Sequence, residues 1–129
     1  MKRWLVGAVL VVAGCKPAYG GVRFFVENEL GEETSEVSEA EIRVLAGVPV
    51  LVKATLESSK RKDYESGKHS LRLESEDDDI LLVERTDVAW EFVFVGGVAG
   101  ETCVRVIVED EDEGCIPAVV LAQQRREDP

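Results

Sequence analysis

This chain of 129 residues has a single histidine and far fewer basic than acidic residues, and each of these shortages argues against a class of function. His69 is the only histidine, which argues against a histidine-based zinc or iron centre. Lys and Arg number 15 against 26 Asp and Glu, so the formal net charge is −11. Nucleic-acid binding needs a basic surface that replaces phosphate counterions, so the charge argues against a nucleic-acid partner. It also argues against adsorption on an anionic membrane through basic patches.

The sequence also lacks an apolar run of the roughly 20 residues that a membrane-spanning helix needs. Its longest apolar run, Trp4 to Ala13, has the length of about ten residues that is typical of a signal peptide. The basic residues Lys2 and Arg3 precede this run, as they do in signal peptides. A buried N-terminal helix or strand is the alternative interpretation.

The residues Val12-Ala13-Gly14-Cys15 closely resemble the lipobox of bacterial lipoproteins, a small-residue motif that ends in an obligatory cysteine. The resemblance implies that residues 1–14 are a removable signal peptide and that Cys15 carries the lipid. Lipoproteins of this class carry several acyl chains such as palmitate, and stable anchoring does need more than one chain. The residue after the cysteine is Lys16 and not Asp, which resembles the Gram-negative sorting signal for delivery to the outer membrane. We therefore expect an extracytoplasmic, lipid-anchored protein, whose mature chain has 13 basic and 26 acidic residues and a net charge of −13.

Two cysteines remain once Cys15 is assigned to lipid, and we predict that Cys103 and Cys115 form a disulfide. Disulfides persist in an oxidising extracytoplasmic compartment. Closing a loop of about 13 residues stabilises a fold by roughly 3 kcal/mol in the chain-entropy model. Two free buried thiols are the alternative. Cys103 shares its alternation with Arg105 and not with Val104, which predicts a bridge on an outer face or at a hairpin end.

Period-two alternation of apolar and polar residues dominates the chain after residue 21 and predicts strands. Strands are expected at 22–26, 42–46, 48–56, 71–74, 80–85, 89–95, 102–108 and 116–123, and the last of these also fits a helix. Loops are expected at 27–39, 58–70, 74–79 and 109–114, and a hairpin turn at 96–100. The expected domain plan is a lipidated cysteine and tether at 15–21, a β-sandwich domain at 22–124 and a charged tail at 125–129.

Seven to eight short strands separated by glycine-rich and acidic turns predict an all-β, antiparallel sandwich. Residues 42–108 also resemble bacterial immunoglobulin-like (Ig-like) domains, in the alternating strand after Gly47 and in the strand led by Gly100. The resemblance implies an Ig-like β-sandwich without the Cys…Trp…Cys pattern of antibody domains.

The alternation also assigns each side chain of a strand to the core or to solvent, because a shift of one residue would place the charges inside. We expect six side chains to be buried: Val50, Val52, Trp90, Phe92, Val104 and Val106. We expect four to be exposed: Lys53, Glu57, Glu91 and Arg105.

Two acidic segments, 74–79 and 109–113, offer the hard oxygen ligands that Ca²⁺ prefers, although neither fits the EF-hand spacing. Solvated turns that keep sheet edges charged are the alternative. Residues 96–102 are rich in glycine but lack the lysine and the spacing of a phosphate-binding loop. We therefore expect no metal and no cofactor.

The segment 66–70 places Ser66 and Ser70 beside His69, but it lacks the nucleophile elbow of serine hydrolases. The basic run Lys60-Arg61-Lys62 is either a docking patch for an acidic glycan or for the protein's own acidic loops, or a solvated loop tip.

These observations favour a non-enzymatic binding or structural module, anchored by lipid in the cell envelope, with an envelope protein or glycan as partner. The alternatives are an accessory subunit of an envelope assembly or secretion complex, and a small hydrolase. A hydrolase would need a deep pocket lined by convergent titratable groups.

Overall fold

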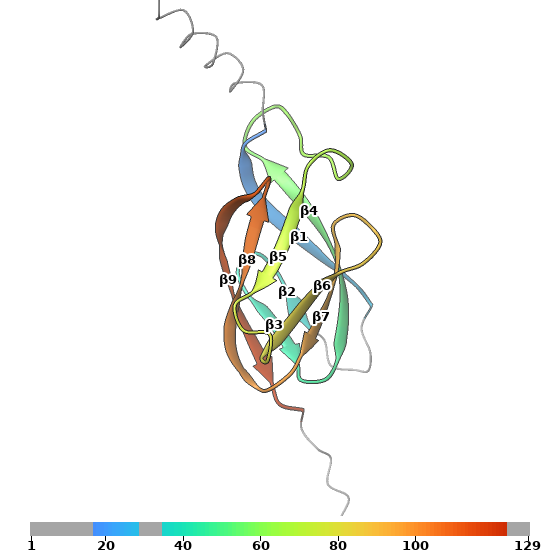
Figure 1. Cartoon of the computed structure of the whole chain (residues 1–129), viewed down its shortest axis with the longest axis vertical. Helices are drawn as coiled ribbons and strands as arrows, with labels where there is room; N and C mark the ends of the chain where they lie inside the picture. The colour runs from blue at the N-terminus through green and yellow to red at the C-terminus, as the bar shows by residue number, and fades with distance from the viewer. Residues whose placement is uncertain (1–16, 29–34, 124–129) are drawn as a thin grey trace, which may run out of the picture.

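The computed structural model describes residues 17–28 and 35–123, which form two β-sheets packed face to face (Figure 1). Residues 1–16, with the expected signal peptide and Cys15, lie outside the described residues, and so do the tail residues 125–129. In the described part of the chain no helix has the length and apolar character needed to cross a bilayer.

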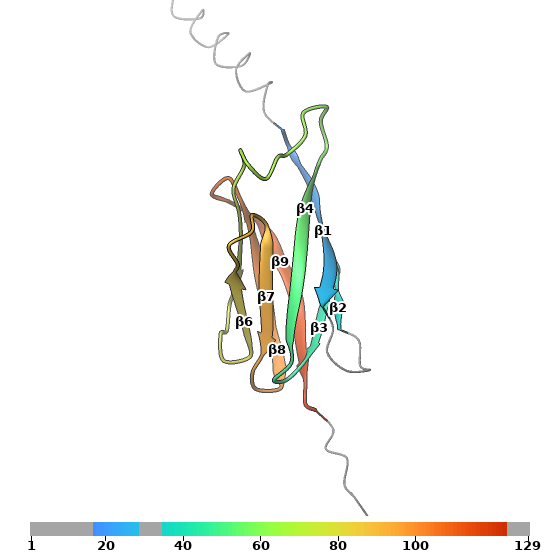
Figure 2. The same ribbon diagram turned by 90° about the vertical axis from the view of Figure 1, so that its right-hand side faces the viewer.

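Nine strands make up the two sheets. One sheet has the order β1-β4-β7-β6 and contains β1 (Tyr19–Asn28), β4 (Pro49–Ser58), β7 (Glu91–Gly96) and β6 (Leu81–Arg85). The other has the order β2-β3-β9-β8-β5 and contains β2 (Glu36–Val37), β3 (Ile42–Leu45), β9 (Glu111–Leu121), β8 (Gly100–Val108) and β5 (Leu71–Ser75). Figure 2 shows the four-stranded sheet in front of β8 and β9.

The strand order is that of an immunoglobulin domain. With β1 as strand A, β4 to β9 take the places of strands B to G, and the sheets become ABED and CFG. β3 pairs in parallel with β9, whereas every other pair of strands is antiparallel. The predicted all-β, Ig-like sandwich is therefore confirmed, with nine strands where seven to eight were expected.

The core lies between the sheets and follows the predicted alternation at five of the six positions. Val50, Val52, Phe92, Val104 and Val106 are all buried, and the alternate residues of the same strands face outward. The largest side chains at the centre include Phe92 and Phe94. The rings of Phe94 and Phe24 make an edge-to-face contact with 6.4 Å between their centroids.

The prediction for Trp90 is wrong, because its side chain is only half-buried. Its φ of 61° takes the backbone out of the extended conformation one residue before β7 begins, so the alternation of that strand does not extend to it. Among the residues expected to be exposed, Glu57 is exposed, whereas Lys53, Glu91 and Arg105 are half-exposed on the outer faces.

Three connections also differ from expectation. The segment 27–39, expected as a loop, holds the end of β1 and all of β2. The segment 109–114 turns only at Glu109 and Asp110, whose φ angles are both positive, and β9 begins at Glu111. Residues 97–99 join β7 to β8 in the other sheet, so they form a crossover between sheets and not a hairpin. The last strand is β9, and its helical alternative is excluded.

Candidate functional site

Three connections meet at one end of the sandwich. They are the β4–β5 loop (residues 59–70), the β6–β7 loop (residues 86–90) and the turn at Glu109–Asp110 between β8 and β9. In immunoglobulin terms these are the B–C, D–E and F–G connections. Loops held on a rigid sandwich are where such folds place recognition residues, as antibody variable domains do. The first described residues of the chain lie at the same end (Figure 1).

A cavity of about 510 Å³, which we call the Trp90 pocket, lies where the three connections meet. Its lining includes Ser66, His69, Arg72, Arg85, Thr86 and Trp90. These side chains place one aromatic surface among several hydrogen-bonding and charged groups.

Trp90 is held in this pocket from both its backbone and its ring. Its carbonyl oxygen accepts a hydrogen bond from the Ala54 N–H at 2.8 Å, and its Nε1–H donates to the carbonyl oxygen of His69 at 3.2 Å. A left-handed backbone at a bulky residue costs free energy and persists only where the surroundings impose it. The ring therefore has a defined position between the β4–β5 and β6–β7 loops.

The two arginines of the pocket differ in their partners. Arg72 binds Asp110 at 2.9 Å and Glu74 at 3.4 Å, so its charge is largely neutralised. Within the described part of the chain, Arg85 makes no ion pair. Thr86 Oγ1 accepts the Val88 N–H at 3.0 Å and donates to Glu91 at 2.7 Å, which orders the β6–β7 loop. Among the described residues, Arg85 is thus the arginine of the pocket whose charge is not neutralised by an ion pair.

A second cavity of about 810 Å³ lies on the other side of His69, between the start of β1 and the β8–β9 turn. Tyr19 and Tyr64 line it together with Glu109, Glu111 and Glu113. Burial, helped by the nearby carboxylates of Glu39 and Glu113, raises the pKa of Tyr19 to about 12. Burial and the hairpin carboxylates also raise the pKa of Tyr64. This cavity is acidic and aromatic, in contrast to the Trp90 pocket.

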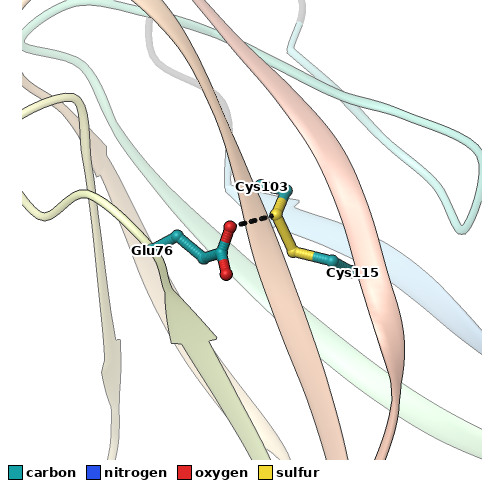
Figure 3. Close-up of side chains that lie close together, drawn as sticks. All are labelled: Glu76, Cys103 and Cys115. Carbon is teal, nitrogen blue, oxygen red and sulfur yellow. Dashed lines mark hydrogen bonds between the residues drawn. A yellow bond between two sulfur atoms is a disulfide. The ribbon is translucent and has the colours of Figure 1, made fainter.

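The predicted disulfide is present on the outer face of the five-stranded sheet, which is one of the two positions that the alternation of Cys103 predicted. It joins the neighbouring strands β8 and β9 with 5.5 Å between the two Cα atoms, inside the range that disulfides span. Figure 3 shows Glu76 beside it, with Oε1 3.0 Å from Cys103 Sγ. A sulfur in a disulfide carries no proton, so this is a direct contact between a carboxylate oxygen and sulfur.

Arg105 holds Glu76 in this position. Its Nε and Nη2 donate to Glu76 Oε2 at 3.0 and 2.6 Å, and its Nη1 donates to Asp112 at 2.7 Å. Hydrogen bonds to these two carboxylates raise the pKa of Arg105. The pKa of Asp112 is lowered, first by the hydrogen bond that it accepts from the Gly114 N–H and also by Arg105. Arg105 thus sits between the two acidic segments.

Several carboxylates of the two acidic segments, which were considered as calcium ligands, are bound by side chains of the protein itself. Arg105 bridges Glu76 and Asp112, Arg72 binds Asp110, and Ser70 donates to Glu109 through both its N–H and its hydroxyl. Within the described residues, the group of three metal-ligand types that lies within 4.8 Å is Glu76 with the two bonded cysteines. Sulfurs joined in a disulfide are not thiolate ligands.

The hydrogen bonds of His69 and Ser70 do not join these two neighbouring side chains into a proton relay. His69 Nδ1 accepts the N–H of Glu65 at 2.8 Å, and the His69 ring packs against the edge of Tyr64. Ser70 donates its hydroxyl to Glu109, away from the imidazole. The histidine therefore shapes the β4–β5 loop.

An apolar strip crosses the outer face of the four-stranded sheet. Phe25 of β1 is 52% exposed and Leu82 of β6 is 37% exposed. The outward side chains of Leu51, Val93 and Val95 lie on the strands between them and are half-buried. Neighbouring exposed apolar side chains of this kind are typical of contact surfaces.

Sequence reasoning missed the Trp90 pocket and the contact of Glu76 with the disulfide. Both sites combine segments that are distant in the sequence, so neither produces a local motif. The weak signal for the pocket was the polar run Thr86-Asp87 just before the second tryptophan of the chain.

No protein-family model matches this chain, and no curated protein sequence matches it. Among solved structures it is similar to the crystal structure of domains 4 and 5 of the S-layer protein SbsC, with a TM-score of 0.52 and 16% sequence identity. The similarity covers 78% of this chain and 54% of that structure, so this chain spans about half of it. At this identity the comparison establishes the fold alone: the chain is an Ig-like β-sandwich similar to one found in an S-layer protein.

Proposed function

We propose that this chain is a lipid-anchored protein of the bacterial cell envelope, and that its Ig-like domain is a non-enzymatic module that binds an envelope saccharide. The lipobox residues that end in Cys15 support the anchor. The disulfide supports an oxidising compartment outside the cytoplasm. The similarity to a domain of an S-layer protein is consistent with a cell-surface role.

The Trp90 pocket is the observation that carries the binding function. The face of an aromatic ring packs against the C–H groups of a sugar, and nearby polar groups bind its hydroxyls. Here Trp90 supplies the ring, while Arg85, Ser66 and Thr86 lie around it. Arg85 also provides the charge for a carboxylate on the ligand.

A binding role fits the polar groups of this end better than a hydrolytic one. The hydrogen bonds of His69 and Ser70 go to Glu65 and Glu109, so they do not join into a nucleophile and base. Arg85 and Asp87 of the pocket are suited to orienting a ligand.

Tryptophan fluorescence tests the binding site directly. Removal of residues 1–14 takes Trp4 away and leaves Trp90 as the sole tryptophan, so emission reports on this pocket alone. Soluble cell-wall fragments and neutral and uronic-acid oligosaccharides should be titrated as probes. We expect a saturable change that is lost in Arg85→Gln and retained in the control Arg23→Gln, whose ion pair with Glu57 lies on the four-stranded sheet. If no saccharide changes the emission, the pocket is not a sugar site.

The anchor is tested by Cys15→Ser in the bacterial host. The parent protein should enter the detergent phase and the variant the aqueous phase, because the variant lacks the sulfur that carries the lipid. A variant that still partitions into detergent would exclude Cys15 as the anchor.

The apolar strip favours a second candidate function, an accessory subunit that packs its four-stranded sheet on another envelope protein. A photocrosslinker at position 25 should then capture one defined partner, whereas a crosslinker at the exposed Val98, in the connection between β7 and β8, should not. Equal crosslinking at both positions would count against this alternative.

A further inference from the structure

The β4–β5 loop is hydrogen-bonded to the first described residues of the chain. The Ser59 N–H donates to the carbonyl oxygen of Ala18 at 2.9 Å, and the Ala18 N–H donates to Ser58 Oγ at 3.3 Å. Ala18 follows Cys15 by three residues, and an extended chain spans at most about 3.5 Å per residue. Three residues span at most about 10.5 Å, so a lipid on Cys15 would be attached close to the β4–β5 loop.

The basic run Lys60-Arg61-Lys62, which we call the basic tip, follows Ser59 directly. All three side chains are exposed. The ion pair that the structure shows within this loop joins Lys68 to Glu65, not to the tip. A lipid on Cys15 would thus bring three consecutive cationic residues next to the bilayer surface.

The acidic β8–β9 hairpin lies at the same end, but it does not reach as far. Figures 1 and 2, which share their vertical axis, both show the β4–β5 loop extending beyond the turn of the hairpin. Three of the hairpin's carboxylates also have partners within the domain: Glu109 accepts a hydrogen bond from Ser70, Asp110 pairs with Arg72, and Asp112 pairs with Arg105. Interactions between exposed charges more than about 8 Å apart are largely screened at physiological salt.

We propose that the basic tip is a second membrane contact, which binds the anionic headgroups of the bilayer that holds the lipidated Cys15. This inference rests on the proposed lipid anchor. The net charge of the chain argues against adsorption by the whole body, but the structure separates a small cationic tip at the anchored end. The contact would hold the sandwich with its long axis pointing away from the membrane (Figure 1).

The tip is itself a trypsin site, so protection from trypsin measures the contact. The lipidated full-length mature protein is reconstituted in vesicles of phosphatidylcholine alone, or with about one third phosphatidylglycerol. Each Lys or Arg at an anionic surface contributes about a fivefold preference for the bound state. We expect cleavage after residues 60–62 to be at least about tenfold slower on the anionic vesicles, and the protection to disappear at about 1 M salt. Cleavage after Arg125 and Arg126 is the internal control, because these residues follow β9 in the sequence and β9 ends at the opposite end of the domain from the tip.

The matched variant is Lys60→Gln/Lys62→Gln, which removes two charges and keeps Arg61 as the cleavage site. Its protection should fall severalfold, whereas Lys60→Arg/Lys62→Arg should behave like the parent. Equal cleavage on neutral and anionic vesicles, whether fast or slow, would overturn the inference, because headgroup charge would then have no role. Flotation of the vesicles tests the anchor separately: protein that does not float with either vesicle refutes the lipid anchor and this inference with it.

Discussion

Replacing Glu76 by Gln should make the Cys103–Cys115 disulfide easier to reduce. Disulfides are reduced by a thiolate that attacks one of the two sulfurs. Glu76 Oε1 lies 3.0 Å from Cys103 Sγ, so an incoming thiolate meets both a negative charge and a blocked approach. Arg105 fixes the carboxylate there with two hydrogen bonds.

The size of the effect follows from Coulomb's law. Two unit charges about 4 Å apart repel each other by roughly 1 kcal/mol in a water-like dielectric. That energy corresponds to about a fivefold change in rate. The disulfide of Glu76→Gln should therefore be reduced by dithiothreitol about fivefold faster than that of the parent. In this variant the charge of Arg105 is no longer balanced by Glu76, so it would attract the thiolate and increase the rate further.

The assay is the rate of reduction of the folded protein, followed by alkylation and mass spectrometry. Glu74→Gln is the matched control, because Glu74 lies in β5, two residues before Glu76, and pairs with Arg72 instead. The difference between parent and Glu76→Gln should be larger for an anionic thiol than for cysteamine, and it should shrink in high salt. If Glu76→Gln is reduced no faster than Glu74→Gln, the carboxylate does not protect the bond.

Three further predictions concern stability and ionisation. Phe94→Ala should lower the free energy of unfolding by about 3–5 kcal/mol in urea denaturation, whereas the exposed Phe25→Ala should change it by less than about 1 kcal/mol; equal losses would contradict the core assignment. The double variant Cys103→Ser/Cys115→Ser should lose roughly 3 kcal/mol in the same assay, and an unchanged midpoint would show that the bridge adds no stability. The pKa of Tyr19 is raised to about 12, so the unfolded chain loses this proton first and stability should fall between pH 10 and 12; Tyr19→Phe should lose less stability over that range, and identical pH profiles would contradict the raised pKa.

The predictable part of this fold is the part that local alternation encodes. Val50, Val52, Val104 and Val106 lie on long regular strands, and for these the pattern of every second residue identified both the strand and its buried face. The position of Cys103 in the same pattern placed the disulfide on an outer face.

The rest depends on backbone conformations and long-range pairings that leave no local pattern. Trp90 and Glu109 have positive φ although neither residue type favours it, so the sequence did not show where the backbone leaves the extended conformation. The paired residues of β3 and β9 are separated in the sequence by more than half the length of the chain, so their pairing depends on how the whole domain folds. The Trp90 pocket was unpredictable for the same reason, because three separate connections must meet to form it.

The parallel pairing of β3 and β9 has a mechanical consequence. β1 starts at one end of the sandwich and β9 finishes at the other, so a pull between those two points runs along the strands (Figure 1). Such a force acts on the hydrogen bonds of the β1–β4 and β3–β9 ladders in shear, and many must break together before a strand can slide. A hairpin pulled open from its ends would instead lose its bonds one after another. A domain tethered to a membrane at the β1 end and loaded at the β9 end would therefore resist tension far better than its modest size suggests.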